Sequence, residues 1–194
     1  MTFDIFIQQG WLMNHRKLKL AMDLCVDAHA NHAKKENVRS WDEKTPYFVH
    51  PLWCAMTLMQ ETSPKVQEGK EDYFFALLFH DLIEDTTVVL PDWLSSESVS
   101  LIRQMTFFGE VGSTEIEKRE IWSRPPIVRL LKLYDKVSNL LDGLWMSDEK
   151  WNGQYAPYVL HLANDAETNF GDLNIVRIAR AVAITRSVSK TTRA

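Results

Sequence analysis

The sequence predicts an all-α domain, and three observations lead to this prediction. Apolar residues recur at helical spacing along most of the 194 residues. The chain has no alternating apolar–polar run of useful strand length, and no internal repeat or Gly/Ser-rich linker divides it. A chain of this length usually forms one domain with a complete apolar core. We therefore expect a single domain over residues 1–194 with six or seven helices.

Periodicity and prolines predict the first three helices. The stripe of apolar residues and histidines over residues 15–35 predicts the first helix, and a polar loop follows up to Pro46. Pro51 is expected at the first position of the second helix, where its missing N–H costs least, and Ser63-Pro64 should end that helix. The segment from Lys70 to Ile83 is rich in Phe, Leu and Ala and predicts the third helix.

Similar signals predict the later helices. One helix should begin at the serine cluster that follows Pro91, and the two prolines at 125–126 should open another that runs to residue 144. Two more are expected over residues 154–168 and 172–187. The pattern over residues 108–123 is too weak to assign.

Composition excludes some classes of function. With 22 Lys and Arg against 26 Asp and Glu, the net charge of −4 disfavours binding to nucleic acid through a basic surface. The longest apolar run, Phe74 to Phe79, is far shorter than the about 20 residues that span a bilayer. Cys25 and Cys54 lie in apolar helical patterns, as buried thiols do in a reducing compartment, and no basic residue precedes His15 as in a signal peptide. We therefore expect a cytoplasmic location, with neither a nucleic acid nor a membrane as partner.

The most informative local pattern is His80-Asp81 followed by Glu84-Asp85. On a continuous helix, His80, Asp81 and Glu84 would share one face with Leu77. An imidazole and two carboxylates among bulky apolar neighbours must be compensated, because burying unpaired charge costs several kcal/mol. A divalent metal ion would compensate them directly.

Two further motifs supply similar donors. His50 stands at the start of a predicted helix, and Asp135 and Asn139 share a face of an otherwise apolar helix. Histidine nitrogens and carboxylate oxygens together suit manganese, iron, zinc, cobalt or nickel. Such a metal lowers the pKa of a bound water until it is a nucleophile near neutral pH, and Glu84 could hold or relay a proton beside it.

The order of these motifs resembles that of the HD-domain metal-dependent phosphohydrolases. The fuller pattern is similar to the hydrolase domain of the RelA/SpoT alarmone enzymes and their small stand-alone relatives. Three segments carry the resemblance, with Ala28-His29 before them: Pro46-Tyr47-x-x-His50-Pro51, His80-Asp81-x-x-Glu84-Asp85-Thr86 and Lys132-Leu133-x-Asp135-Lys136-x-x-Asn139. It covers about residues 20–145 and leaves residues 150–190 as a helical C-terminal extension.

The resemblance implies an HD-domain helical bundle, a manganese cofactor and removal of the 3′-pyrophosphate from guanosine tetra- or pentaphosphate. The metal ligands that it implies are His50, His80, Asp81 and Asp135. The catalytic residues that it implies are Glu84, Asp85 and Asn139. The substrate would lie against the loop before the first motif, so that Trp41, Lys44 and Tyr47 are candidate substrate-binding residues.

The chain departs from the family pattern at two places near the expected substrate. The family's basic pair in the loop before Pro-Tyr is replaced by Ser40-Trp41-Asp42-Glu43-Lys44, and its Arg-Thr after the Asn is replaced by Leu141-Asp142. Trp41 could stack on a nucleobase, whereas Asp42 and Asp142 would repel additional phosphate groups.

Alternatives to the main interpretation stay open. The enzyme could instead remove phosphate or triphosphate from another nucleotide or deoxynucleotide, or the domain could be an inactive nucleotide or metal sensor. Asp85 could end its helix and cap the loop at Thr86-Thr87, and Asn139 could be a structural contact. His29 and His32 are expected to be core histidines, with His29 able to orient a ligand. The oligomeric state is open, with a homodimer among the options.

Overall fold

The computed structural model describes residues 15–34, 38–107, 113–143 and 146–188. Seven of the helices in these ranges have ten residues or more, as the six or seven expected helices require. Within the described ranges no strand forms, and the only β-type pairings are isolated bridges between Ala33 and Thr86 and between Val38 and Pro46. The helices in chain order are α2 (His15–Asn31), α3 (Val49–Leu58), α4 (Pro64–Gln67), α5 (Lys70–Phe79), α6 (Leu82–Asp85), α7 (Ser96–Met105), α8 (Ser113–Glu120), α9 (Pro126–Leu141), α10 (Asp148–Lys150), α11 (Ala156–Phe170) and α12 (Asn174–Val188).

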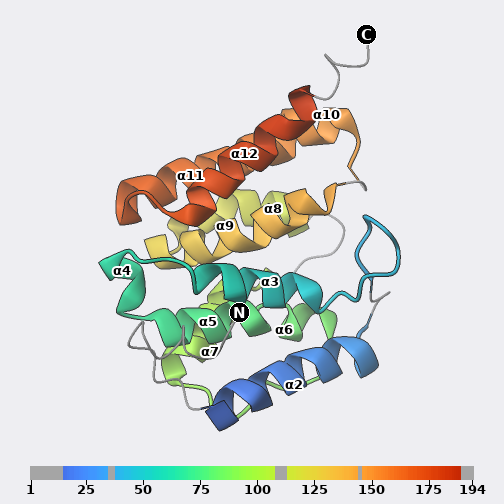
Figure 1. The fold of residues 1–194 in the computed structure, drawn as a ribbon, viewed down its shortest axis with the longest axis vertical. Coiled ribbons are helices and arrows are strands. Elements are labelled where there is room, and N and C mark those ends of the chain that lie inside the picture. Colours follow the sequence, from blue (N-terminus) through green and yellow to red (C-terminus); the bar gives the residue numbers. More distant parts are fainter. Residues whose placement is uncertain (1–14, 35–37, 108–112, 144–145, 189–194) are drawn as a thin grey trace.

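The helices are stacked in layers, with α2 at one end of the molecule and α11 and α12 at the other (Figure 1). Helix α9 lies between the other layers: it packs against α3, α5 and α7 on one side and against α11 and α12 on the other. Most of its residues are buried, and they include charged residues as well as Leu, Val and Tyr. A helix that is covered on all sides lies in the core, so the charged side chains of α9 must find their partners inside the protein.

The predicted boundaries of the second and third helices are wrong. The second helix begins at Val49, so that Pro51 is its third residue rather than its first. The first-turn N–H groups of a helix have no intrahelical partner in any case, and for that reason Pro51 is tolerated there. The third helix ends at Phe79 rather than at Ile83, and the unassigned stretch contains α8 followed by a 3₁₀ turn at Ile121–Ser123. Part of that stretch, residues 108–112, lies outside the described residues.

Local capping explains two of the other boundaries. The side chain of Ser95 accepts a hydrogen bond from the Ser98 backbone N–H at 2.9 Å and so caps α7, as the serine cluster predicted. Gly171 has a φ of 85° after α11, a conformation that favours glycine, and this turn lets α12 return along α11. In the C-terminal part of the chain a π-helical turn at Trp151–Tyr155 precedes α11.

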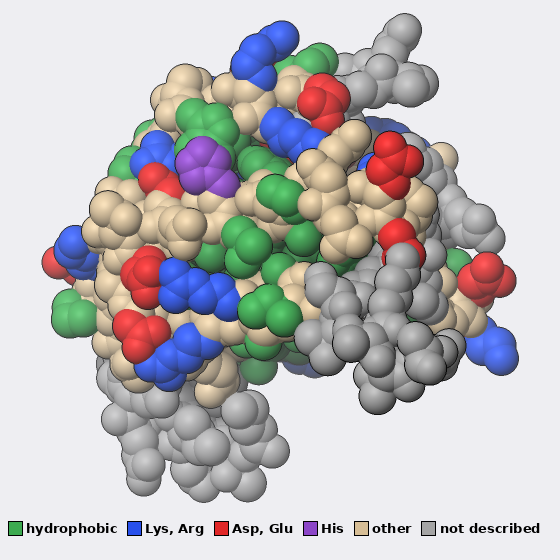
Figure 2. Space-filling model, turned by 90° about the horizontal axis from the view of Figure 1, so that it is seen from above, with side chains coloured by type: hydrophobic (Ala, Val, Ile, Leu, Met, Phe, Trp, Pro, Cys, Tyr) green, Lys and Arg blue, Asp and Glu red, His purple; other side chains and the backbone are tan. Residues whose placement is uncertain are grey.

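The outer face of the α11–α12 layer carries Lys and Arg interspersed with Asp and Glu (Figure 2). Two of the arginines of α12 are paired with nearby acids: Arg180 with Glu167, and Arg177 with Asp172. This face is therefore mixed in charge rather than uniformly basic. None of the described helices combines the length and the apolar composition that crossing a membrane requires.

Candidate metal centre

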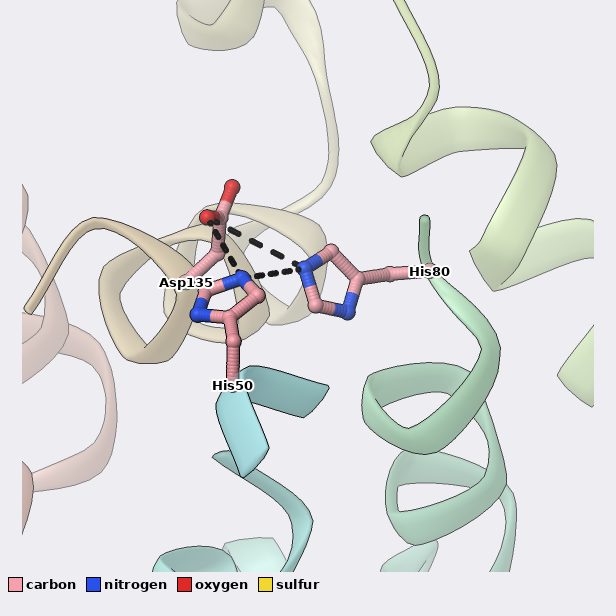
Figure 3. A group of neighbouring side chains, drawn as sticks. All are labelled: His50, His80 and Asp135. Atoms are coloured by element: carbon pink, nitrogen blue, oxygen red, sulfur yellow. Dashed lines mark hydrogen bonds and ion pairs between the residues drawn. The ribbon is translucent and has the colours of Figure 1, made fainter. Parts of the chain in front are cut away.

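Three buried side chains from separate helices point toward one another (Figure 3). His50 comes from α3, His80 directly follows α5, and Asp135 comes from α9; their exposed fractions are 1, 2 and 3%. The two histidine Nε2 atoms are 3.1 Å apart, and Asp135 Oδ1 lies 3.4 Å from Nε2 of His50 and 3.9 Å from Nε2 of His80. Ligand atoms that bind one ion at about 2.1 Å are separated by about 3.0–3.5 Å at right or tetrahedral angles. Two of the three separations lie in this range and the third corresponds to a wider angle, so the group could hold a metal ion.

Both imidazoles are oriented by a second hydrogen bond. His80 Nδ1 lies 2.7 Å from the carbonyl oxygen of Leu77, which can only accept, so Nδ1 carries the proton and donates it. His50 Nδ1 lies 2.8 Å from Oγ of Ser138. A metal-binding histidine typically donates its distal N–H in this way, because the bond fixes the ring and leaves the other nitrogen unprotonated. The arrangement directs both Nε2 atoms into the centre.

The predicted single helix face through Leu77, His80, Asp81 and Glu84 is wrong. Helix α5 ends at Phe79 and α6 begins at Leu82, so His80 and Asp81 lie in the turn between two helices. The imidazole of His80 bonds the Leu77 carbonyl that would otherwise continue the helical ladder, which gives a local reason for the break. The turn nevertheless brings His80 and Asp81 to the same centre, because the backbone of both residues stays in the αR region.

Asp81 contacts both histidines of the centre. Its Oδ2 lies 3.3 Å from His50 Nε2, and its Oδ1 lies 3.2 Å from His80 Nε2. The hydroxyl of Tyr47 donates to Oδ2 at 2.8 Å. His50, His80 and Asp135 each place one donor atom within 4.8 Å of the donor atoms of the other two.

The carboxylates give the centre a strong preference for positive charge. Burial opposes ionisation of Asp81, yet His80 and His50 hold its pKa well below the usual range. Burial alone would lower the pKa of His80, but Asp81 and Asp135 outweigh it and raise this pKa to about 9. A divalent ion satisfies such a site better than one proton does, because it interacts with both carboxylates and both imidazoles at once.

The two oxygens of Asp135 have different partners. Oδ1, which faces the histidines, accepts from Asn139 Nδ2 at 2.7 Å. Oδ2 lies 2.9 Å from Nζ of Lys132 and 3.2 Å from Nζ of Lys136. Although burial opposes ionisation, the two lysines hold the pKa of Asp135 well below its usual range. Asn139, predicted as catalytic, thus contacts the centre through Asp135.

The acidic pair after His80-Asp81 is half-buried on α6. Glu84 Oε1 accepts from the Phe107 backbone N–H at 2.8 Å, which anchors this side chain beside α7. Burial raises the pKa of Glu84, Lys132 opposes that shift, and Asp81 adds to it. The charge of Asp85 is close enough to contribute to the raised pKa of Tyr47, behind burial and Asp81. After α6 the hydroxyl of Thr86 donates to Leu82 O and accepts from Val88 N.

The loop before α3 carries the predicted substrate-binding residues Trp41 and Lys44. Trp41 is 40% exposed, and its indole N–H donates to Thr45 Oγ1 at 3.0 Å. Lys44 is exposed as well. The hydroxyl of Tyr47, by contrast, is bound to Asp81 at 2.8 Å. Of the three predicted residues, Trp41 and Lys44 are therefore exposed on the loop, and Tyr47 contacts the candidate metal centre through Asp81.

The prediction that Asp142 would repel substrate phosphates is wrong. Asp142 is 4% exposed, and its Oδ2 pairs with Nε of Arg39 at 3.1 Å. Its two oxygens also accept from the backbone N–H groups of Ser40 and Trp41 at 3.0 and 2.7 Å. The charge of Asp142 is thus neutralised inside the protein, where it ties the loop to the end of α9. The guanidinium of Arg39 is held by Asp142 and also donates to the Ser138 carbonyl at 2.9 Å.

Asp42, the second acid expected to repel phosphate, lies exposed in the loop. Its carboxylate accepts from the backbone N–H groups of Lys44 and Thr45, and the bond from Thr45 does most to lower the pKa of Asp42 to about 2. It therefore fixes the shape of the turn.

The two histidines of α2 have different surroundings. His29 is buried, as expected for a core histidine, and its ring lies 5.3 Å from that of Tyr47. Neither ring nitrogen of His29 has a hydrogen-bond partner among the described residues, so it does not orient a ligand by a direct bond. Burial lowers its pKa to about 4. His32 is about half-exposed and lies 3.5 Å from Asp27, so the expectation that it is a core residue is wrong.

Sequence reasoning missed several residues around the centre. The hydroxyl of Ser138 contacts His50, and Arg39 joins the loop to α9 through Asp142. Lys132 and Lys136 are part of the third motif, and the spacing of Lys132 three residues before Asp135 is a helical signal that could have indicated a contact. The contact of Lys136 with Asp135, its neighbour in the chain, has no such signal. Glu117, which contacts both lysines, comes from α8, where the sequence pattern had assigned nothing.

Sequence comparison finds relatives among the hydrolases that the motifs predicted. The mouse protein named guanosine-3′,5′-bis(diphosphate) 3′-pyrophosphohydrolase MESH1 is 29% identical over 121 residues, which are 58% of this chain and 64% of that protein. The human protein of the same name is 27% identical over 140 residues, 68% of this chain and 72% of its own length. The alignment to the mouse protein thus spans just under two thirds of it. No family model matches the chain.

A solved structure described as a metazoan orthologue of SpoT that hydrolyses ppGpp superimposes with a TM-score of 0.67 at 18% identity. The superposition covers 90% of this chain and 97% of that one. The chain has the fold of this hydrolase. The expected all-α HD-type bundle is thereby confirmed. Because residues 1–145 are only about three quarters of the 194 residues, the likeness must extend into the C-terminal helices, for which the sequence had suggested no counterpart.

Proposed function

We propose that this protein is a metal-dependent phosphohydrolase that removes the 3′-pyrophosphate from guanosine tetra- or pentaphosphate. The observation that carries the proposal is the buried group of His50 on α3, His80 in the turn after α5 and Asp135 on α9, whose donor atoms lie close enough together to hold a metal ion. The relatives named as guanosine-3′,5′-bis(diphosphate) 3′-pyrophosphohydrolases support the choice of substrate.

The proposed metal ligands are His50, His80, Asp81 and Asp135. The set of two imidazoles and two carboxylates is a borderline nitrogen and oxygen site, for which we propose manganese, with iron, zinc, cobalt and nickel as alternatives. When bound, such an ion would lower the pKa of a water molecule and stabilise negative charge on the phosphoryl group. Tyr47 would hold Asp81 in place through its 2.8 Å hydrogen bond, and Ser138 would orient His50.

Glu84 and Asp85 are proposed to handle protons at the reacting phosphoryl group. Glu84 is held by the backbone of Phe107, so its carboxylate has a defined position rather than a freely rotating one. Burial raises its pKa toward the range in which a carboxylate exchanges protons near neutral pH. Asn139 would fix the orientation of Asp135 through its 2.7 Å hydrogen bond.

The loop of Trp41 and Lys44 is proposed to receive the nucleotide. An indole that is 40% exposed can stack on a base, an interaction of about 1–3 kcal/mol that does not depend on which base it is. Lys44 offers an exposed ammonium for a phosphate. Because Arg39 is buried against Asp142, it is not available to a substrate without breaking that pair.

A comparison of catalytic efficiencies tests this proposal. Purified protein with Mn²⁺ should hydrolyse guanosine tetraphosphate, release pyrophosphate and lose activity on treatment with a chelator. Deoxynucleoside triphosphates and nucleoside monophosphates, assayed at the same Mn²⁺ concentration, test the alternative phosphohydrolase activities. Greater efficiency on a deoxynucleotide would overturn the proposed substrate. Bound metal without hydrolysis of any nucleotide would indicate the sensor. The cytoplasmic location and the oligomeric state stay predictions.

A further inference from the structure

We propose that Glu117, on α8 and outside all three motifs, is a positioning residue that sets the affinity of the metal centre through Lys132 and Lys136. This inference rests on the metal-binding part of the proposed function and is independent of the substrate. It assigns a role to a segment for which the sequence suggested none.

The geometry places two lysines between two buried carboxylates. Glu117 is 5% exposed, and its Oε2 lies 3.2 Å from Nζ of Lys132 and 2.9 Å from Nζ of Lys136. The same two ammonium groups lie 2.9 and 3.2 Å from Oδ2 of Asp135. We call Glu117, Lys132, Lys136 and Asp135 the lysine–carboxylate cluster. Each lysine in it is shared by a carboxylate that faces the metal centre and one that does not.

The cluster leaves one oxygen of Asp135 for the metal. Oδ2 is occupied by the two ammonium groups, whereas Oδ1 faces His50 and His80 and accepts one hydrogen bond from Asn139. The lysines therefore determine which oxygen is presented and hold the carboxylate in one orientation. Glu117 in turn holds the lysines, and Tyr158 on α11 donates to Glu117 Oε1 at 3.0 Å.

The charges of the cluster balance only when Glu117 is present. Two ammonium groups face two carboxylates, so the cluster is neutral with Asp135 ionised. Without the charge of Glu117, Asp135 would be the one remaining ion-pair partner of the two buried ammonium groups among the described residues, and the cluster would carry a net positive charge beside the centre. Coulomb repulsion from this charge disfavours a divalent cation, and it acts over a short distance through a poorly screened interior.

The expected consequence is weaker metal binding when the charge of Glu117 is removed. Replacement of groups that orient metal ligands typically lowers metal affinity by about 10–100-fold. For Glu117→Gln, which keeps the size and the polar atoms of the side chain, we expect the dissociation constant for Mn²⁺ to rise by about that factor.

The test measures Mn²⁺ binding to the metal-stripped full-length protein by titration calorimetry, without any nucleotide. The matched control is Glu61→Gln, since Glu61 is also a buried glutamate that accepts from a tyrosine hydroxyl at 3.0 Å but contacts no metal-centre lysine. A second control, Tyr158→Phe, removes the hydroxyl that bonds Glu117 without changing any charge. Both controls should leave the dissociation constant close to that of the unmodified protein.

A charge-balanced double variant separates the electrostatic role from a merely structural one. In Glu117→Gln/Lys136→Met, one positive and one negative charge are removed together, and Lys132 and Asp135 remain as a neutral pair. We expect this variant to recover most of the affinity that Glu117→Gln loses. A residue that only supported the fold would change the melting temperature of the metal-free protein in step with the affinity for Mn²⁺. The melting temperature of the metal-free variants records any structural effect separately.

Each outcome bears on one proposal. No Mn²⁺ binding by the unmodified protein would overturn the metal centre itself. Normal binding by Glu117→Gln, or a double variant as weak as the single one, would overturn only the role of Glu117.

If Glu117→Gln does not fold, Lys136→Met tests the same charge balance with the opposite sign. The cluster of this variant carries one surplus negative charge, so the protein should bind Mn²⁺ more tightly. Equal or weaker binding by Lys136→Met would contradict the proposal.

Discussion

Glu61 and Glu117 are both buried, and their carboxylate charges are compensated by different kinds of partner. Both are at most 5% exposed, and each accepts a hydrogen bond from a tyrosine hydroxyl at 3.0 Å. The remaining partners of Glu61 are the backbone N–H groups of Asn174 and Ile175, both at 2.9 Å, at the start of α12. Those of Glu117 are the ammonium groups of Lys132 and Lys136.

The difference shows how a buried charge acquires a structural or a functional role. The N–H groups at the start of a helix have no intrahelical partner, so the charge of Glu61 stabilises the attachment of α12 and contacts neither lysine of the cluster. Lys132 and Lys136 contact Asp135 as well as Glu117, so the charge of Glu117 affects the charge balance beside the metal centre. We therefore expect changes at Glu61 to affect stability, and changes at the lysine–carboxylate cluster to affect metal binding.

The largest effect should follow from Asp135→Asn, which removes the carboxylate common to the cluster and the metal centre. The variant should retain no stoichiometric metal. It should also unfold more easily, because breaking a buried ion pair typically costs about 3–5 kcal/mol. Elemental analysis and thermal unfolding measure the two effects. Asp165→Asn is a suitable control, because Asp165 pairs with Arg129 away from the metal donors and its replacement should leave metal binding intact. Stoichiometric metal in Asp135→Asn would exclude Asp135 as a ligand.

Glu84→Gln should separate proton transfer from metal binding. Hydrolysis should fall by about 10²–10⁴-fold, the usual contribution of general acid–base catalysis, while metal content stays normal. Because burial raises the pKa of Glu84, a carboxylate acting as a base should lose activity as the pH falls, and should do so at a higher pH than an ordinary glutamate. This acidic limb of the pH–rate profile should be missing in Glu84→Gln. Turnover near that of the unmodified protein would assign the role to Asp85.

Glu61→Gln should lower the stability of the protein and leave its affinity for Mn²⁺ unchanged. The amide can still accept hydrogen bonds, but the charge that faces the start of α12 is lost, and its NH₂ group needs a partner of its own. We expect a loss of about 1–3 kcal/mol in the free energy of unfolding, measured by denaturant titration. The affinity for Mn²⁺ should not change. A weakened metal site in this variant would show that the two buried glutamates are not as separate as their contacts indicate.

Trp41→Ala should affect neither buried cluster. The side chain is 40% exposed, so its loss should hardly change stability, and the affinity for Mn²⁺ should stay the same. The loss of a stacking interaction should raise KM by about tenfold across nucleotides with different bases. Steady-state kinetics on guanosine and adenosine nucleotides provide the measurement. An increase for guanosine nucleotides alone would mean that the loop recognises the base and does not simply stack on it.

The helical class and most helix positions could be predicted from the sequence, because both depend on neighbours along the chain. Apolar spacing, the cap at Ser95 and the turn at Gly171 act within one or two helical turns, where sequence and geometry are directly related. The prediction failed at His80, where a side-chain bond to the Leu77 carbonyl replaces a backbone bond. Periodicity carries no information about such competition.

The metal-binding side chains of the candidate centre could be predicted from the sequence, whereas the residues that hold them in place could not. His50, His80 and Asp135 stand in recognisable motifs, and the tertiary structure brings them together. Ser138 and Glu117 lie in no motif that names their role, because a serine or glutamate on a helix has the same local pattern whether it faces solvent or a histidine or lysine in the core.

The sequence by itself determined the positions of the seven long helices in the described ranges and which side chains could bind a metal, since these depend on backbone preferences and on the chemistry of single residues. Only the tertiary structure decided how each charge is compensated. Asp142 illustrates this, because its sequence position suggested repulsion of phosphate, whereas folding pairs it with Arg39, more than a hundred residues earlier in the chain. The physical reason is that the effect of a charge depends on its distance to other charges and to water, and packing alone sets those distances.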